Sequence, residues 1–184
     1  DLSTGQQPIP DETKRYWIAY NGELYNYKEL RVELEALGHR FQSTSDTEVL
    51  LHAYMQWGVD ALPRLNAAYA CAIYDREREE LLLARDRYGK RPLFYTHVGG
   101  SLVFASEMKS FLAFPEMRFE VDEAQLASIF TTWTPLPDQS GFTGIRQIPN
   151  GWYLKRRGGA ETLAPYTTLD WPAGRFEGSA AEAI

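Results

Sequence analysis

The sequence predicts an α+β domain built on antiparallel sheets. Its strand-like segments come in adjacent pairs, such as residues 93–96 and 102–105 around the turn "HVGG", and such pairs form hairpins. Its helix-like segments gather in residues 26–58 instead of alternating with single strands, which argues against a doubly wound parallel sheet. With 184 residues, of which 44% are hydrophobic, the chain is long enough for one domain with a sizeable core and a tail.

Residues 15–20, "RYWIAY", predict the first strand, because aromatic residues and Ile favour a pleated, half-buried surface. We expect this strand to stop at Asn21-Gly22, since Asn-Gly is the dipeptide most typical of a tight turn. A plain turn is therefore one interpretation of these two residues, and a binding site is the other.

Two helices are predicted next, over residues 26–38 and 45–58, with a shorter helical piece over 60–65. Each longer helix opens with Asn or Ser followed three residues later by Glu, a capping-box-like pair, and each is stopped by Gly. Asp46 thereby falls in the first turn of the second helix, where a carboxylate complements the helix dipole. That structural role is an alternative to a binding role for Asp46.

The rest of the chain predicts three hairpins and two more helices. In chain order these are strands over 69–74 and 81–85, strands over 93–96 and 102–105, a helix over 106–114, a helix begun by Asp122, irregular chain over 131–150, and strands on either side of Gly158-Gly159. Residues 172–184 are rich in Gly, Ala and Glu, which is typical of a linker, so we expect the folded domain to span 1–171.

Composition excludes several classes of protein. The net charge of −6 argues against non-specific nucleic-acid binding, which requires a basic face. No apolar run approaches the ~20 residues of a membrane helix. The one cysteine, Cys71, forms no internal disulfide, which fits a reducing compartment and a cytoplasmic location. The three histidines lack metal spacing and no phosphate-binding loop is present, so we expect no metal or cofactor in this chain.

The stretch "YNGEL", residues 20–24, is the best candidate for chemistry. The side-chain N–H of Asn21 and the backbone N–H of Gly22 can donate to one oxygen, and such a donor pair makes an oxyanion hole. Glycine also lets a ligand approach the backbone closely. Glu23 and Asp46 could both hold an ammonium group through charge-assisted hydrogen bonds. The four residues suit a ligand with a carbonyl at one end and a cation at the other, such as an amino acid amide.

Two further features have both a structural and a chemical interpretation. Cys71 lies in the apolar run "YACAIY" without an accompanying base, so we expect a buried, unreactive thiol far from Asn21. Residues 85–92, "RDRYGKRP", carry five charges, which favours a solvated loop with internal ion pairs over a phosphate-binding site.

Several blocks of sequence, in order, resemble glutamine-hydrolysing asparagine synthetases. These blocks are "YNGELYNYKELRVELEALGHRFQSTSDTEVLLHAYMQWG", "RLNAAYACAIYDREREELLLARDRYGKRPLFY", "FASEMKSFL" and "GFTGIRQIPNGWYL". The matching part is the class II glutamine amidotransferase domain, over residues 1 to 171. The resemblance implies a fold of the N-terminal-nucleophile type, an αββα sandwich of two antiparallel sheets with helices outside, incomplete here at its N-terminus.

The resemblance also implies hydrolysis of glutamine to glutamate and ammonia. The ammonia would pass to a separate C-terminal synthetase domain that uses ATP and Mg²⁺ to make asparagine from aspartate. Asn21 and Gly22 match the family's oxyanion hole, and Glu23 and Asp46 match its glutamine-binding residues. Glutamine and the synthetase domain are thus the expected partners, and the oligomeric state, a homodimer included, stays open.

The chain departs from the family at its nucleophile, a cysteine at the mature N-terminus. The sequence begins at Asp1, and Cys71 matches a core position, so this chain alone is expected to be inactive. The family's arginine for the glutamine carboxylate is expected to be missing with the same segment. Smaller departures are Ala67 in place of Gly and "PNGW" in place of "PPGH". Two alternatives stay open: an amidotransferase of this architecture acting on another acceptor, and a non-catalytic domain retained for contacts or assembly.

Overall fold

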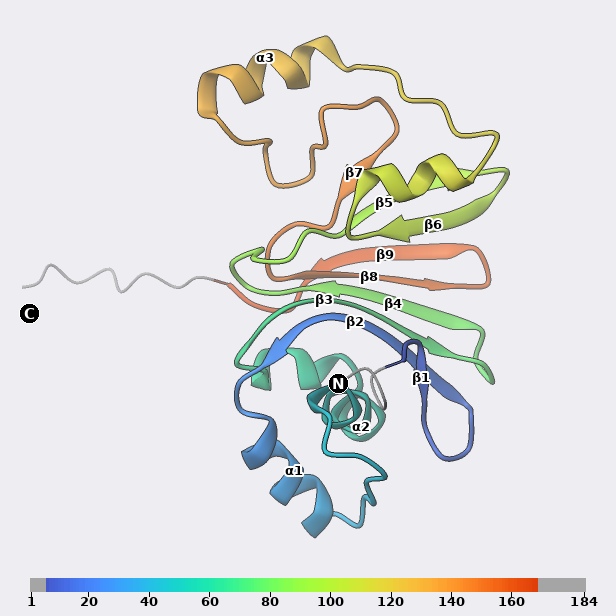
Figure 1. The fold of residues 1–184 in the computed structure, drawn as a ribbon, viewed down its shortest axis with the longest axis vertical. Coiled ribbons are helices and arrows are strands. Elements are labelled where there is room, and N and C mark those ends of the chain that lie inside the picture. Colours follow the sequence, from blue (N-terminus) through green and yellow to red (C-terminus); the bar gives the residue numbers. More distant parts are fainter. Residues whose placement is uncertain (1–5, 169–184) are drawn as a thin grey trace, which may run out of the picture.

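The structure, a computed structural model, describes residues 6–168 and contains two antiparallel sheets with helices outside them (Figure 1). The first sheet has the strand order β1-β2-β3-β4-β8-β9, and the second has the order β6-β5-β7. The strands are β1 (Ile9–Pro10), β2 (Tyr16–Leu24), β3 (Ala67–Asp75), β4 (Glu80–Arg85), β5 (Phe94–Val98), β6 (Ser101–Ala105), β7 (Arg146–Gln147), β8 (Trp152–Arg157) and β9 (Ala160–Pro165). The helices are α1 (Tyr27–Ala36), α2 (Asp46–Trp57) and α3 (Glu123–Thr132), with 3₁₀ helices η1 (Gly58–Arg64) and η2 (Met108–Ala113).

Three hydrophobic clusters separate the layers of the fold. The first lies between α1 and α2 and one face of the six-stranded sheet, and it includes Ile18 and Leu50. The second lies between the two sheets and includes Leu83 and Tyr95. The third lies between the three-stranded sheet and η2, around Phe111. This order of helix, sheet, sheet and helix confirms the predicted α+β class and the αββα sandwich (Figure 1).

Strand β2 continues past the point where the sequence predicts a turn. Asn21 pairs with Ala70 and Gly22 with Tyr69, in an unbroken antiparallel register with β3. The predicted turn is wrong because pairing with a neighbouring strand outweighs the local preference of a dipeptide. A Cβ on Gly22 would lie 2.4 Å from the carbonyl O of Ala68 and 2.7 Å from Cβ of Tyr69. The close approach of β3, and not a turn, therefore requires glycine here.

Helices α1 and α2 begin where the sequence predicts them, but only one has the expected cap. Ser45 caps α2 by accepting a hydrogen bond from the N–H of Thr47 at 3.2 Å. Asn26 makes no capping hydrogen bond to α1. Its amide instead donates to the carbonyl of Arg64 and accepts from the N–H of Asn66, both at 3.0 Å. These two bonds anchor the start of α1 to the segment that leads into β3.

The hairpins of the second half are confirmed, whereas two short helices differ from the prediction. Strands β3 and β4, β5 and β6, and β8 and β9 pair antiparallel as expected. The segments predicted as helices over 60–65 and 106–114 form the 3₁₀ helices η1 and η2. Strand β1 was not predicted, because two residues are too few to show alternation. The linker predicted over 172–184 lies outside the described residues.

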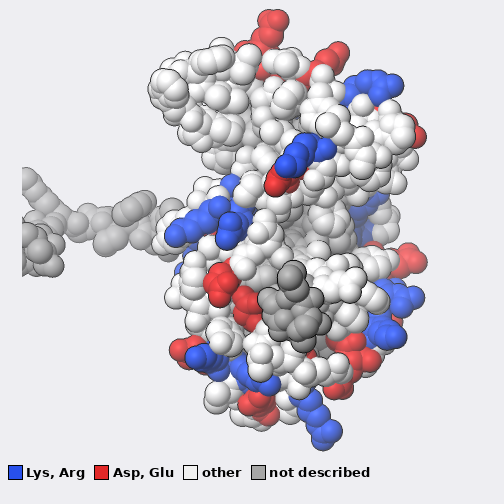
Figure 2. All heavy atoms as spheres, in the orientation of Figure 1, with Lys and Arg blue, Asp and Glu red and all other residues white. Residues whose placement is uncertain are grey.

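Helix α3 lies farthest from the six-stranded sheet (Figure 1). Asp122 caps it as predicted, by accepting a hydrogen bond from the N–H of Gln125 at 3.0 Å. None of its ten residues is buried, and Phe130 and the following Trp133 are 74% and 92% exposed. On the face shown in Figure 2, this end of the molecule carries few charged side chains, whereas charges of both signs are interspersed over the lower part.

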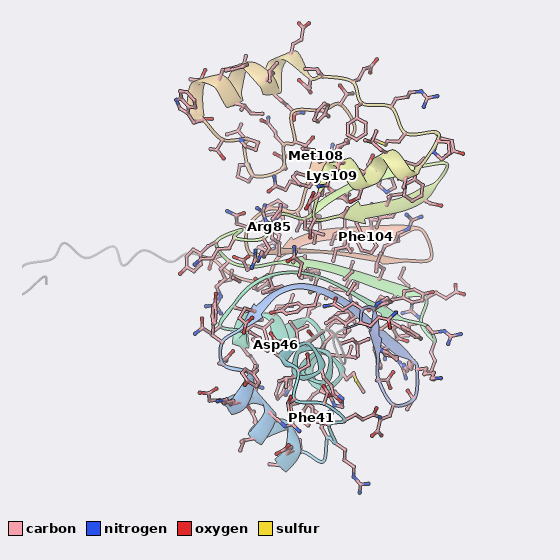
Figure 3. All side chains as sticks on the ribbon, viewed as in Figure 1. Phe41, Asp46, Arg85, Phe104, Met108 and Lys109 are labelled. Atoms are coloured by element: carbon pink, nitrogen blue, oxygen red, sulfur yellow. The ribbon has the colours of Figure 1, made fainter. Side chains whose placement is uncertain are left out.

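Residues 85–92 form a loop that is organised by two buried charged side chains. The Arg85 guanidinium, at the end of β4 (Figure 3), donates to three backbone carbonyls, those of Gly89, Arg91 and Ile148. Asp86, fully buried, accepts from four backbone N–H groups, those of Tyr69, Tyr88, Lys90 and Arg91. The predicted solvated loop with internal ion pairs is wrong for Arg85 and Asp86, which are buried and satisfied by the backbone of the loop and its neighbours. Lys90 and Arg91 are exposed, as a solvated loop requires.

Candidate active site

A cavity of about 260 Å³ opens between the two sheets beside the middle of β2. Much of its wall is apolar, with contributions from Ala72 on β3, Leu93 before β5 and Phe104 on β6. Asn21 and Ser106 bring polar side chains to the same wall. An apolar hollow with a few convergent polar groups is the usual form of a small-molecule site.

One edge of β2 has no neighbouring strand beyond Ile18 among residues 6–168, because β1 pairs only with Trp17 and Ile18. Backbone N–H groups in an antiparallel strand point alternately to its two sides. The N–H of Tyr16 bonds the Asp11 carboxylate on the β1 side, and the N–H of Tyr25 bonds a carbonyl on the β3 side. The even-numbered residues of β2 therefore direct their N–H groups to the open edge.

Side chains take the place of a strand along this open edge. The Tyr20 N–H donates to Oε1 of Gln7, and the Leu24 N–H donates to Oδ2 of Asp46 at 2.9 Å. Gly22 lies midway between them and directs its N–H to the same edge. No described residue accepts a hydrogen bond from that N–H on this side. The edge thus offers a backbone donor to an oxygen atom brought by a ligand.

Asn21 directs its side chain toward the second sheet, because alternate side chains of β2 face opposite sides and Tyr20 belongs to the cluster beneath the helices. Its Nδ2 donates to Oγ of Ser106, just past the end of β6, at 3.1 Å. An amide nitrogen carries two N–H groups, so one remains for a ligand. Asn21 thus offers an N–H donor at the cavity, and the next residue, Gly22, offers one at the open edge of β2.

The two predicted carboxylates lie near the end of β2. Glu23 is exposed on the same side of the strand as Asn21, whereas Asp46, at the start of α2 (Figure 3), reaches the open edge through its bond to Leu24. Burial raises the pKa of the Tyr20 phenol well above its usual value, and the charges of Asp46 and Glu23 raise it further. Neither carboxylate is among the residues that line the cavity, and no hydrogen bond among the described residues joins the two. A shared binding pocket for Glu23 and Asp46 therefore stays a prediction.

Cys71 is buried in β3 as predicted, but it is not far from Asn21. It pairs with Tyr20, the residue before Asn21, and contributes to the cavity wall. Its side chain belongs to the cluster beneath α1 and α2, whereas Asn21 faces the other sheet. Burial raises the pKa of the Cys71 thiol to about 12, so little thiolate exists at neutral pH. The expected separation is wrong because the register of β2 and β3 could not be derived from the sequence.

Ser106 and Gln7 are site residues that sequence reasoning missed. Ser106 was expected at the start of a helix, with no link to Asn21, which lies 85 positions earlier. Gln7 belongs to a turn-rich stretch with no motif. The one usable signal was the position of Ser106 directly after a predicted strand, since polar residues at strand ends often line a site.

The described part of the chain has neither a metal-binding group of side chains nor a membrane-spanning helix. Residues 6–168 hold no group of three or more His, Cys, Asp or Glu side chains placed to bind a metal ion. His39 and His52 approach each other with 2.9 Å between their Nδ1 atoms, but they form no such group. No helix in the same range is long and apolar enough to cross a membrane.

This chain is similar to known proteins over most of its length. The family model described as a glutamine amidotransferase domain matches residues 1–167. Glutamine-hydrolysing asparagine synthetase 3 of Bacillus subtilis is 46% identical over 151 residues, which are 80% of this chain and 25% of that protein. A putative glutamine-hydrolysing asparagine synthetase of Mycobacterium tuberculosis is 34% identical over 177 residues, 91% of this chain and 27% of that protein. The chain thus spans about a quarter of these relatives' length.

Solved structures show the same arrangement of sheets and helices. Glutamine phosphoribosylpyrophosphate amidotransferase from B. subtilis matches with a TM-score of 0.64 and 25% identity, over 89% of this chain and 32% of that chain. A glutamine aminotransferase class-II domain protein from Silicibacter pomeroyi matches with a TM-score of 0.54 and 14% identity, over 84% of this chain and 69% of that chain. The second likeness is one of fold alone.

Proposed function

Because the chain belongs to the glutamine amidotransferase domain family, we propose that it is the glutaminase part of a glutamine-dependent asparagine synthetase. In this role it hydrolyses glutamine to glutamate and ammonia, and a synthetase part of the full-length protein uses the ammonia to amidate aspartate. The observation that carries the proposal is the pair of donors on consecutive residues, the side-chain amide of Asn21 and the N–H of Gly22 at the open edge of β2.

The N–H donors of Asn21 and Gly22 are suited to the step in which negative charge develops on the side-chain carbonyl oxygen of glutamine. Attack on the side-chain amide of glutamine turns its carbonyl oxygen into an oxyanion, and fixed N–H donors stabilise that charge more than the neutral carbonyl. Each donor in such a hole contributes about 2.7–4 kcal/mol to the transition state. Gly22 adds access, because the absence of a side chain lets the reacting carbon approach the backbone.

The carboxylates suit the other end of glutamine. The α-ammonium group of the substrate is a compact cation with three donors, and Glu23 and Asp46 are carboxylates near the same end of β2. Asp46 accepts from the N–H of Leu24 through Oδ2 at 2.9 Å and from the hydroxyl of Thr47 through Oδ1 at 3.5 Å. Because each carboxylate oxygen has two lone pairs, Asp46 keeps acceptor capacity for a further donor. We assign both residues to ammonium binding, where each charge-assisted bond contributes about 1.5–3 kcal/mol.

The nucleophile is proposed to come from a part of the full-length protein outside this chain. A thiolate adds to the amide carbon, the C–N bond breaks as ammonia takes a proton and leaves, and water then cleaves the thioester to release glutamate. Cys71 does not fit this role, because its thiol is buried on the far side of the sheet from Asn21 and its pKa is raised. ATP and Mg²⁺ are assigned to the synthetase part.

Ammonia release from glutamine tests the proposal. We expect the full-length protein to release ammonia, and its Cys71→Ser variant to match it within about twofold. Residues 1–184 alone, shown to be folded by circular dichroism, should release none above background. A full-length protein without glutaminase activity would contradict the proposal. Turnover by residues 1–184 alone would show that the nucleophile lies in this chain, with Cys71 as the first residue to replace.

A further inference from the structure

Ser106 links the two sheets at the candidate active site. It follows β6, an edge strand of the three-stranded sheet, and its Oγ accepts a hydrogen bond from Nδ2 of Asn21 at 3.1 Å. Asn21 belongs to the six-stranded sheet, so the bond crosses the cavity to which both residues contribute. Figure 3 labels Phe104, on β6, and Met108, at the start of η2, which precede and follow Ser106 in the chain and lie in the half of the molecule that holds the three-stranded sheet.

The Asn21 side chain needs such a partner if it is to act as an oxyanion donor. It is exposed on its strand, and the described residues offer it no hydrogen bond other than the one to Ser106. An exposed side chain without a partner samples several rotamers. A donor in an active site must be held to within about 0.5 Å, and a misplacement of about 1 Å can lower the rate by about 10²-fold.

A serine hydroxyl can hold the Asn21 amide and still leave one of its two N–H donors free. The oxygen accepts one N–H of Asn21, and the second N–H stays free for a ligand. The neighbouring side chains offer the Asn21 amide few other hydrogen-bond acceptors. Phe104 and Leu93 are apolar, and the carboxylate of Glu107 is engaged by Lys109 at 2.6 Å. The bond between Asn21 and Ser106 is therefore the contact that fixes the donor.

We propose that Ser106 is a positioning residue for the oxyanion hole. It holds the Asn21 amide so that the free N–H of Asn21 and the N–H of Gly22 meet at the side-chain carbonyl oxygen of glutamine. This inference rests on the proposed function. Ser106 acts through Asn21 and does not touch the reacting atoms, so its loss weakens stabilisation of the transition state more than binding of the ground state.

Substitution of Ser106 in the full-length protein tests the inference. We expect Ser106→Ala to lower kcat for glutamine hydrolysis about 10- to 100-fold with KM within about twofold. Ser106→Thr keeps the hydroxyl and should restore most of kcat. Ser110→Ala is the matched control, because Ser110 is exposed on η2, and it should leave both constants unchanged. Equal melting temperatures for the variants would show that the fold is intact.

A double-substitution cycle separates positioning from other effects. Once Asn21 is replaced by Ala, removal of the Ser106 hydroxyl should lower kcat no further, because residues that act as a unit are not additive. A full additional loss in the double variant, or an unchanged kcat in Ser106→Ala, would overturn the role of Ser106 in a protein that hydrolyses glutamine. A wild-type protein that does not hydrolyse glutamine would contradict the proposed function itself.

Discussion

Asn21 and Gly22 contribute donors of different kinds because they are consecutive residues of one extended strand. The side chain of Asn21 leaves the plane of the sheet toward the second sheet, where it bonds Ser106. The N–H of Gly22 lies in the plane of the sheet and is directed to the open edge of β2. A face donor and an edge donor can thus converge on one oxygen without a turn in the backbone.

The close packing at Gly22 predicts a cost for any side chain there. In Gly22→Ala the new Cβ would meet the carbonyl of Ala68 and Cβ of Tyr69 in β3, so β2 must shift. We expect a loss of about 1–3 kcal/mol in the free energy of unfolding of the domain, measured by urea denaturation. Gly38→Ala is the control, because a Cβ there meets nothing within 4 Å and its cost comes only from the positive φ. Equal stability of Gly22→Ala and wild type would contradict the packing described for β2.

At this scale the sequence predicts the chemical groups of the site better than their geometry. The dipeptide at 21–22 identifies an amide and an unhindered backbone, and both donors are present in the structure. The predicted turn at these two residues was wrong, because pairing with the distant strand β3 decides whether they form a turn or continue a strand. Ser106 could not be linked to Asn21 by spacing alone, since their contact depends on how two separate sheets stack.

Two phenylalanines of the second half show which elements hold the fold together. Phe111 on η2 is 1% exposed in the hydrophobic cluster between η2 and the three-stranded sheet, whereas Phe130 on α3 is 74% exposed. The 3₁₀ helix η2 thus belongs to the core, although it is short. Helix α3 is attached through its first turn, where Gln125 accepts from the N–H groups of Ser140 and Gly141 at 3.1 and 3.0 Å.

This contrast predicts that the same substitution costs much more stability at Phe111 than at Phe130. We expect Phe111→Ala to lower the free energy of unfolding by about 3–5 kcal/mol, because it removes a fully buried aromatic ring. Phe130→Ala, the matched control, should change it by less than about 0.5 kcal/mol. Thermal or urea denaturation of the two variants measures the difference. A large loss in Phe130→Ala would mean that the outer face of α3 is covered in the folded protein.

Elements were predictable where a local pattern decides them. The hairpins β5–β6 and β8–β9 follow from alternation around glycine-rich turns, and α2 follows from its cap and helical periodicity. The loop at 85–92 was not predictable in the same way. Its charges look solvated in the sequence, yet Arg85 and Asp86 are buried because each satisfies several backbone groups at once.

For the whole molecule, residue patterns predict the α+β class. The αββα sandwich is predicted only by the resemblance to glutamine-hydrolysing asparagine synthetases. Adjacent hairpins indicate antiparallel sheets, but nothing in the periodicity says that β1 to β4 share a sheet with β8 and β9 while β5 and β6 share a sheet with β7. That order brings the end of β6 over the middle of β2 and so creates the cavity. The candidate site is therefore a property of the stacked sheets.

The rate of glutamine hydrolysis by the Asn21→Ala variant of the full-length protein shows most directly whether Asn21 and Gly22 form an oxyanion hole. Removal of one such donor should lower kcat about 10²–10³-fold. The melting temperature should stay close to that of the wild type, because the Asn21 side chain is exposed. A kcat within about twofold of wild type in a folded variant would show that the Asn21 amide does not contribute to an oxyanion hole.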